Sequence, residues 1–508
     1  MTNICIIATI IIYLVAMLLV GVAYSKSNND STDFYLGGRK MGPLVTAMSA
    51  EASDMSSWLL MGMPGLAYLT GIASPGWTAI GLALGTWLNW LIVARRLRRY
   101  SANLEAITVP QFLSLRFHDQ RNLLNALGAV IIIVFFVPYT ASGFAACGKL
   151  FHSLFGVDYM AAMVVSACVI VGYTITGGFR AVTTTDLIQS IVMSLALVAV
   201  LVYGIGAAGG WDAVVANAQS LPGYLTMMAS HNAAGGTATS YSLLDIVSTM
   251  AWGLGYFGMP HILVRFMAVR DEKEMTKSKA TAISWVALSL GFAVFIGTLG
   301  RAYLPELVNG NNEKVFIEMI KKVFTVEMRA PFIAGLFLCG ILAAIMSTAD
   351  SQLLVSASSV AEDIFKGLLK KDADDKTVMN VSRVTVLVVA VLAYIIAWNP
   401  NNTVMGLVSN AWAGLGAAFG PLVVMSLYWK RTNFPGAVAG IVTGALAVII
   451  WDYIPLVGGQ TLGKATGLYS LVVGFGLGLI AIIAVSLATK APSEEMLQEF
   501  EDVKANRL

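Results

Sequence analysis

The succession of apolar segments is the feature that most restricts how this 508-residue chain can fold. A helix needs about 20 mostly apolar residues to cross a bilayer. Hydrophobic residues make up 57% of the chain and charged residues 12%, whereas soluble domains carry about 25% charged residues. The sequence therefore predicts an all-α polytopic membrane protein with about 13 transmembrane helices. These predicted spans cover residues 3–24, 44–68, 74–94, 123–148, 159–177, 186–207, 241–264, 280–303, 330–362, 379–398, 404–428, 435–455 and 466–489.

The basic residues between the spans predict how the chain is oriented. Cytoplasmic connections of membrane proteins are enriched in Lys and Arg, and here these residues fall in alternate connections. The first span follows no basic region and no cleavage site, so we expect a retained helix and no signal peptide. The N-terminus is then outside and the tail, 490–508, is in the cytoplasm of a bacterial-type cell. The basic residues concerned are Lys26, Arg39, Lys40, Arg95, Arg96, Arg98, Arg99, Arg180, Arg270, Lys273, Lys277, Lys366, Lys370, Lys371, Lys430 and Arg431.

An ionisable residue, Asp54, stands near the centre of the second span, within the sequence SDMSSW. A carboxylate at that depth is costly and in most cases has a function, with a cation as its partner. The alternative is a neutral, protonated Asp54 that is hydrogen-bonded inside the helix bundle.

The seventh span contains helix-breaking residues at its centre, in the sequence WGLGYFGMP at 252–260. Glycine and proline destabilise a continuous helix, and irregular backbone at membrane depth occurs where it lines a cavity or is covered by protein. Interrupted helices in corresponding halves of a chain indicate a secondary transporter. If the stretch between them is helical, Trp252 and Tyr256 share a face and suit a small, partly apolar zwitterion. A glycine packing interface with a proline kink is the other interpretation.

The ninth span offers oxygen ligands for a sodium ion. Ser347 and Thr348 follow Ala344 by three and four residues, so both hydroxyls lie within one turn of the Ala344 carbonyl. Together with carbonyls from an unwound second span, these groups would suit Na⁺. The alternative is that both hydroxyls bond only to their own helix backbone.

Other classes of function find little support in the sequence. A membrane-embedded enzyme would need a metal cluster or a nucleophile with its base, but the four histidines are scattered. A sensor would need a signalling module, for which the tail is too short. The net charge of +3 is spread over the connections and gives no basic face for nucleic acid. Cys5, Cys147, Cys168 and Cys339 lie within spans without metal-like spacing and are interpreted as buried apolar residues.

Several longer motifs resemble the sodium:solute symporter family, and within it the bacterial proline carriers. They are SAEASDMS at 49–56, GGFRAV at 177–182, WGLGYFG at 252–258 with Pro260 and His261, and MST at 346–348. Later matches are GLVS at 406–409, AWAG at 411–414, FGP at 419–421 and KAPS at 490–493. The similarity runs essentially from end to end.

This resemblance implies a LeuT-type core of two inverted five-helix repeats. Repeat one would cover about 44–207 and repeat two about 241–428, with an extra helix at 3–24 and two peripheral helices at about 435–489. The function implied is sodium-coupled symport of L-proline by alternating access. A symporter of the same fold that uses sodium or protons to carry another amino acid, pantothenate or a sugar is the alternative.

The resemblance also implies roles for individual residues. Asp54 would be a coupling carboxylate near the ion, and Asp186 a second residue linked to sodium, although Asp186 also suits a helix N-cap. The sodium ligands would be Ala52, Met55, Ala344, Ser347 and Thr348. The substrate would contact Ser56, Trp58, Tyr139, Trp252, Tyr256 and Pro260.

Four positions bear on how strictly sodium is coupled. Glu51 replaces a small residue one turn before Asp54, and Ser57 and Met259 also differ from the commonest pattern of the family. Asp350 adds a further acid to the ninth span. Two carboxylates three residues apart repel each other, which leaves participation of protons or lithium open.

Overall fold

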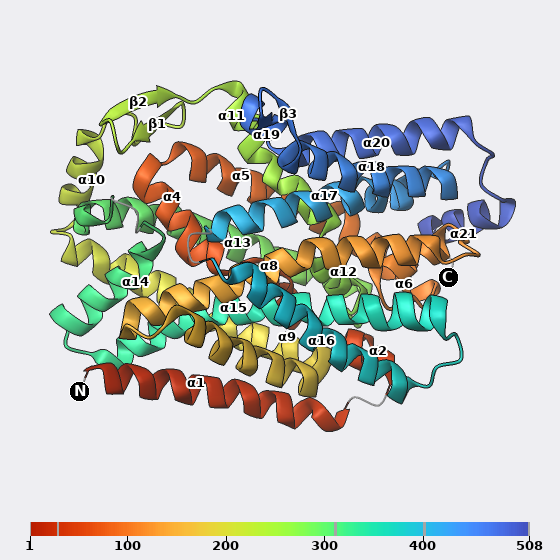
Figure 1. Cartoon of the computed structure of the whole chain (residues 1–508), viewed down its shortest axis with the longest axis horizontal. Coiled ribbons are helices and arrows are strands. Elements are labelled where there is room, and N and C mark those ends of the chain that lie inside the picture. Colours follow the sequence, from red (N-terminus) through yellow and green to blue (C-terminus); the bar gives the residue numbers. More distant parts are fainter. Residues whose placement is uncertain (1, 28–29, 309–311, 400–402, 506–508) are drawn as a thin grey trace.

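The computed structural model describes residues 2–27, 30–308, 312–399 and 403–505. Long helices run nearly side by side along the longest axis of the molecule, and two small hairpins lie along its upper edge in this view (Figure 1). The long helices are α1 (Thr2–Tyr24), α5 (Ala73–Leu88), α8 (Leu123–Phe155), α9 (Tyr159–Ala207), α13 (Met275–Tyr303), α15 (Pro331–Ser358), α16 (Asp375–Ala397), α17 (Val404–Tyr428), α18 (Phe434–Tyr453) and α20 (Ser470–Ala488).

Shorter elements complete the chain. They are α2 (Ser31–Leu36), α3 (Pro43–Asp54), α4 (Met63–Thr70), α6 (Ala94–Asn103), α7 (Val109–Arg116), α10 (Trp211–Ser220), α11 (Leu243–Met250), α12 (Pro260–Met267), α14 (Val315–Ile320), α19 (Leu462–Thr466) and α21 (Glu494–Ala505). Strands β1 (Ala229–Asn232) and β2 (Thr237–Ser240) pair antiparallel, as do β3 (Pro455–Val457) and β4 (Gln460–Thr461).

Within the described residues, 10 helices are long and apolar enough to cross a membrane. The predicted second and seventh spans are each divided into shorter helices, and α9 covers both the fifth and the sixth. The two divided spans and the two joined spans together account for the difference between 10 long helices and 13 predicted spans. The count of 13 stays a prediction.

The junction inside α9 corrects one predicted boundary. The sequence places the sixth span from residue 186, but the structure continues as helix directly after a bend at Gly178, where φ is 60° and ψ is −161°. A β-carbon at Gly178 would lie 2.8 Å from the Phe34 ring. The bend therefore needs glycine for both its conformation and its space.

Burial separates the centre of the bundle from its periphery. In α15 and α17, 78% of the most apolar window is buried, whereas the value is 22% in α1 and 28% in α20. Large side chains of α1 such as Ile4, Ile12 and Leu19 are exposed, as expected for a helix that faces lipid. The predicted sodium and coupling residues are themselves buried, and they lie on α3, α9 and α15 or at the end of α3.

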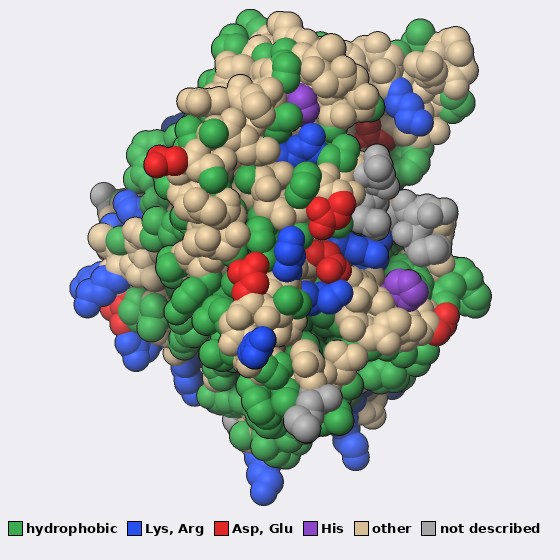
Figure 2. Space-filling model, turned by 90° about the vertical axis from the view of Figure 1, so that its left-hand side faces the viewer, with side chains coloured by type: hydrophobic (Ala, Val, Ile, Leu, Met, Phe, Trp, Pro, Cys, Tyr) green, Lys and Arg blue, Asp and Glu red, His purple; other side chains and the backbone are tan. Residues whose placement is uncertain are grey.

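The two ends of the bundle carry different charges. Predicted cytoplasmic residues meet at the end that holds α6 and α21: Arg39 donates to backbone carbonyls of Ala106 and Met267, and Arg99 donates to that of Val503. The opposite end carries α10, α14 and the β1–β2 hairpin, and acidic and basic side chains are mixed on it (Figure 2). Arg39 and Arg99, two of the residues predicted to be cytoplasmic, thus lie at the same end of the bundle.

Candidate functional site

The second span is interrupted directly after its carboxylate. Helix α3 ends at Asp54, and Met55 leaves the helical conformation with φ −78° and ψ 74°. The Ser56 amide then donates to the Asp54 carbonyl at 2.8 Å, and the π-helix η3 (Trp58–Gly62) follows. The break leaves backbone groups of α3 free of their usual helical partners.

The seventh span is interrupted in a different way. After α11 the chain tightens into the 3₁₀-helix η5 (Ala251–Gly258), becomes extended at Met259 and restarts as α12 at Pro260. Its glycines also allow close packing, because a β-carbon at Gly253 would lie 2.1 Å from the Gly81 carbonyl oxygen on α5. Both interpretations of this segment therefore hold in part: the helix is broken, and its glycines form a packing interface.

Asp54 links the two interrupted helices. The Tyr256 hydroxyl of η5 donates to Asp54 Oδ2 at 2.6 Å. The Asp54 carbonyl accepts the Trp58 indole N–H at 2.9 Å and the Tyr139 hydroxyl of α8 at 3.4 Å. All four side chains are at most 1% exposed. Three of the predicted substrate residues thus meet at Asp54, Tyr256 at its carboxylate and the other two at its backbone carbonyl. Ser56 lies next to them and accepts from the Trp58 backbone amide at 3.5 Å.

The aromatic pair of the seventh span does not share a helical face. In a 3₁₀-helix, residues four apart point in different directions. Trp252 stacks on Tyr469 with ring centroids 5.3 Å apart, and Tyr256 meets Trp412 edge-to-face at 5.3 Å. The rings are connected through Trp412, which stacks on Trp252 at 6.4 Å and donates its N–H to the Trp252 carbonyl at 2.8 Å. Pro260 contributes as the first residue of α12.

The oxygens predicted to bind sodium lie where α15 meets the end of α3. The Ser347 hydroxyl donates to the Ala52 carbonyl at 2.8 Å and lies 3.3 Å from that of Ala344. Thr348 donates to the same Ala344 carbonyl at 3.2 Å. Met55 is the residue at which α3 ends. The backbone bonding proposed as the alternative is therefore present, and the Ser347–Ala52 bond also brings the two elements together.

Asp186 lies inside α9 and is not a helix N-cap, so that alternative is wrong. Its Oδ2 accepts from the Ser49 hydroxyl at 2.6 Å and from Arg265 Nη2 of α12 at 2.9 Å. The same guanidinium donates to Ser351 of α15 at 2.6 Å. Asp186 and Arg265 form an ion pair with side chains 0% and 1% exposed. This pair connects four elements on the α6 side of the interrupted helices.

The two additional acids are both buried. Glu51 accepts the Trp90 indole N–H at 2.7 Å. Asp350 accepts the Tyr173 hydroxyl at 2.7 Å and the Ser351 hydroxyl at 3.1 Å. Each carboxyl therefore has a specific hydrogen-bond donor from a neighbouring element.

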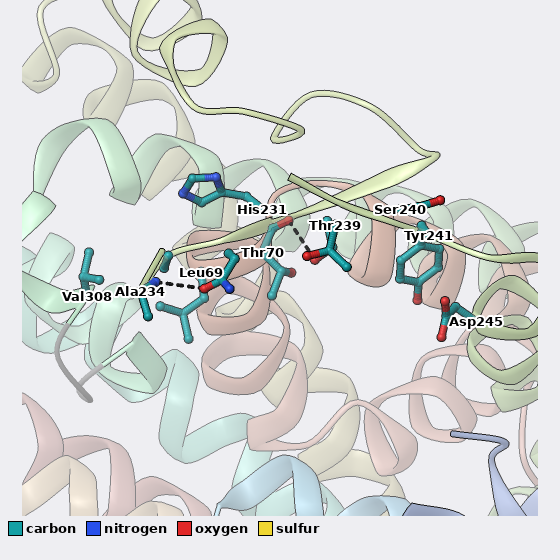
Figure 3. Close-up of a pocket in the computed structure, with 12 residues that line it drawn as sticks. Leu69, Thr70, His231, Ala234, Thr239, Ser240, Tyr241, Asp245 and Val308 are labelled. Carbon is teal, nitrogen blue, oxygen red and sulfur yellow. Dashed lines mark hydrogen bonds between the residues drawn. The ribbon is translucent and has the colours of Figure 1, made fainter. Parts of the chain in front are cut away.

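The site at the interrupted helices is separate from a pocket of about 710 Å³ near the β1–β2 hairpin. In Figure 3, His231 and Ala234 lie at one end of this pocket and Tyr241 and Asp245 at the other. None of the predicted site residues lines it. Across the described ranges, no group of three or more His, Cys, Asp or Glu residues is arranged to hold a metal ion.

Two interrupted helices that face each other at the centre of an apolar bundle define a secondary transporter. The family model described as "Sodium:solute symporter family" matches residues 34–444. The chain belongs to that family, whose members are transporters and not enzymes, and it is a multi-pass protein of the plasma membrane.

Relatives of known function are similar over almost their whole length. The "High-affinity proline transporter PutP" of Bacillus subtilis is 43% identical over 96% of this chain and 98% of its own. The "Sodium/proline symporter" of Escherichia coli is 42% identical over 98% and 96%. A solved structure of a Na⁺-coupled sialic acid symporter has a TM-score of 0.77 at 21% identity and covers 96% of this chain and 99% of its own. The fold is therefore the LeuT type, as the resemblance implied.

Four residues of the site were not predicted. Trp412 donates to the Trp252 carbonyl, and Arg265 forms the ion pair with Asp186. Asn89 donates to the Tyr256 carbonyl, and Trp90 donates to the Glu51 carboxyl. Trp412 lies within a motif that was noticed for its resemblance alone. Polar residues inside apolar segments are a signal that would have included Arg265 and Asn89.

Proposed function

We propose that this protein imports L-proline together with Na⁺ by alternating access. The observation that carries the proposal is the direct contact of the two interrupted helices through Tyr256 and Asp54, beside the Ser347–Ala52 bond. The names of the curated relatives, which include proline transporters and sodium/proline symporters, give the solute and the ion. Inward movement of Na⁺ supplies about 2.3 kcal/mol per charge per 100 mV, in addition to its concentration gradient.

In this proposal Na⁺ binds between α3 and α15. The ligands are the carbonyls of Ala52, Met55 and Ala344 and the hydroxyls of Ser347 and Thr348. Ser347 now donates its proton to the Ala52 carbonyl, and it would turn so that both oxygens face the ion. Na⁺ then replaces the hydrogen bond that joins α3 and α15.

Asp54 and Asp186 act as coupling residues without direct contact to the ion. Asp54 provides negative charge at the broken end of α3 and orders Tyr256 of η5. Asp186 fixes Arg265 beneath the site. Binding of Na⁺ therefore stabilises the geometry in which η5 presents the solute pocket.

Proline occupies the space bordered by Ser56, Trp58, Tyr139, Trp252, Tyr256 and Pro260. Aromatic rings pack well against a pyrrolidine ring. Backbone amides at an interrupted helix suit the carboxylate because they lie at the positive end of a helix dipole. The side chains are closely packed around Asp54, so the solute enters only when η5 and α3 separate.

The membrane arrangement follows from the same proposal. Repeat one comprises about 44–207 and repeat two about 241–428, with the N-terminus outside and the tail in the cytoplasm. The gathering of Arg39, Arg99 and their neighbours at the α21 end supports this orientation. The last three residues of the tail, 506–508, lie outside the described residues.

The test is uptake of radiolabelled L-proline by proteoliposomes that carry an inward Na⁺ gradient, with K⁺ and proton gradients as controls. We expect Na⁺-dependent accumulation that excess unlabelled proline abolishes. Ser347→Ala should raise the half-saturating Na⁺ concentration at least tenfold, because one oxygen ligand is lost. Accumulation driven only by protons would contradict the sodium assignment, and competition only by other amino acids, pantothenate or sugars would replace the solute.

A further inference from the structure

A π-helical turn in the third span contacts both interrupted helices. This turn, η4 (Asn89–Val93), lies between α5 and α6. Asn89 Nδ2 donates to the Tyr256 carbonyl of η5 at 3.0 Å, and Trp90 Nε1 donates to Glu51 Oε1 of α3 at 2.7 Å. The two donors are neighbours in sequence and are 1% and 3% exposed. One short turn therefore reaches both interrupted helices.

The acceptors of these bonds lie next to groups with proposed roles in binding. Glu51 directly precedes Ala52, whose carbonyl accepts from Ser347. Tyr256 carries the hydroxyl that donates to Asp54. A shift of the η4 turn would thus move the sodium side and the solute side of the site together.

The indole ring of Trp90 also contacts α12. The Trp90 ring packs edge-to-face against Phe266 of α12, with centroids 4.6 Å apart. The Trp90 N–H donates to the carboxyl of Glu51, which is 1% exposed. Neither donor is exposed to water that could replace these bonds, and π-helical turns often mark functional positions.

We propose that Asn89 and Trp90 are positioning residues that carry part of the energetic coupling between Na⁺ and the solute. The inference rests on the proposed function, because it requires both ligands to bind at the interrupted helices. Coupling is reciprocal: the factor by which Na⁺ tightens solute binding equals the factor by which solute tightens Na⁺ binding. Loss of either hydrogen bond lowers this coupling factor. Substitution of a residue with a purely structural role would instead lower the amount of folded protein and leave the coupling factor unchanged.

The experiment measures the coupling factor in the purified full-length protein. The half-saturating concentration of radiolabelled proline is determined at trace and at saturating Na⁺, and the ratio of the two values is the factor. Trp90→Phe keeps an aromatic ring but loses the N–H, and Asn89→Ala loses the amide donor. We expect each change to lower the factor about threefold to tenfold, the range for one internal hydrogen bond.

The matched control is Trp77→Phe on the neighbouring α5. Trp77 likewise donates its indole N–H, but to the backbone carbonyl of Met227, at 2.9 Å and away from the breaks in the two interrupted helices. Its loss should leave the coupling factor unchanged. In addition, Trp90→Phe should cause no further loss in a Glu51→Ala background, because the bond has already been removed.

The outcomes separate the role of η4 from the proposed sodium site. If Trp90→Phe and Asn89→Ala keep the coupling factor of the unmodified protein, the inference is wrong. If the Asn89 variant does not fold, Trp90→Phe alone decides. If Ser347→Ala leaves the half-saturating Na⁺ concentration unchanged, the proposed sodium site is wrong; if Ser347→Ala raises it and the η4 variants have no effect, only the role of η4 is rejected.

Discussion

At the scale of single residues, the Tyr256 hydroxyl makes the most direct contact between the two broken helices. Tyr256→Phe keeps the ring against Trp412 but leaves Asp54 Oδ2 without its donor. Loss of a hydrogen bond to a buried group costs about 1–3 kcal/mol. We expect the half-saturating proline concentration to rise by roughly 5-fold to 150-fold, measured as uptake into proteoliposomes at fixed Na⁺.

The control for this change is Tyr159→Phe, since the Tyr159 hydroxyl donates to the Ala397 carbonyl at 3.0 Å outside the site. It should leave the half-saturating proline concentration within twofold of the unmodified value, an effect of about 0.4 kcal/mol. Equal effects of the two substitutions would argue against a role of the Tyr256–Asp54 bond in solute binding.

The buried ion pair gives a second prediction at this scale. Removal of one partner of such a pair leaves an uncompensated charge and costs about 3–5 kcal/mol. Arg265→Gln alone should therefore lower the thermal unfolding temperature in detergent strongly, because Asp186 loses its cation. The double variant Asp186→Asn with Arg265→Gln should recover much of that loss. A double variant as unstable as the sum of the single variants would show that the two residues act independently.

Residue types in the sequence predicted one part of the site better than the other. Asp54, Ser347 and Thr348 could be selected because polar groups inside an apolar span need partners. Trp412 could not, because its bond to the Trp252 carbonyl joins positions 160 residues apart. A hydrogen-bond partner that is distant in sequence depends on how the helices pack, and no local sequence pattern predicts it.

At the scale of elements, the crossing of η5 over α5 depends on glycine. A β-carbon at Gly85 would lie 2.2 Å from the Gly253 carbonyl oxygen, whereas one at Gly291 in α13 would meet nothing within 4 Å. Gly85→Ala should force the elements apart and cost about 1–3 kcal/mol. Gly291→Ala should be neutral or stabilise the helix by up to about 1 kcal/mol.

Thermal unfolding and proline uptake together test this difference. We expect Gly85→Ala to lower both the unfolding temperature and the apparent affinity, because η5 carries Tyr256. If Gly85→Ala behaves like Gly291→Ala, then the close approach of η5 and α5 is not needed for stability or binding.

Element boundaries were predicted where composition marks them. Glycine and proline indicated the break before Pro260, and the structure has it. The 3₁₀ geometry of η5 could not be predicted, because the choice between helix types is made by packing against α5 and α17. The joining of two spans in α9 was also missed, since residues 178–185 contain the polar run that usually marks a connection.

At the scale of the whole molecule, the tail helix α21 packs beside α6 (Figure 1). Phe500 is 5% exposed and lies against Arg116, whose guanidinium carbon is 5.3 Å from the ring centroid. Phe500→Ala should weaken this docking by up to about 3 kcal/mol, so that protease added to inside-out vesicles removes the tail many times faster. Gln498→Ala, at an exposed position, should not.

Vesicles of the opposite orientation test the predicted sidedness in the same assay. A tail in the cytoplasm is protected in right-side-out vesicles, whichever variant they carry. Cleavage of the tail in intact right-side-out vesicles would reverse the proposed orientation.

The bend at Gly178 has a mechanical consequence. The two arms of α9 are joined at Gly178, with no loop between them. A change in direction between the arm that begins at Tyr159 and the arm that carries Asp186 would therefore alter the φ and ψ angles of Gly178. Because Phe34 of α2 packs against Gly178, such a change would also displace α2, so the short helix after the first span is coupled to the angle between the two arms.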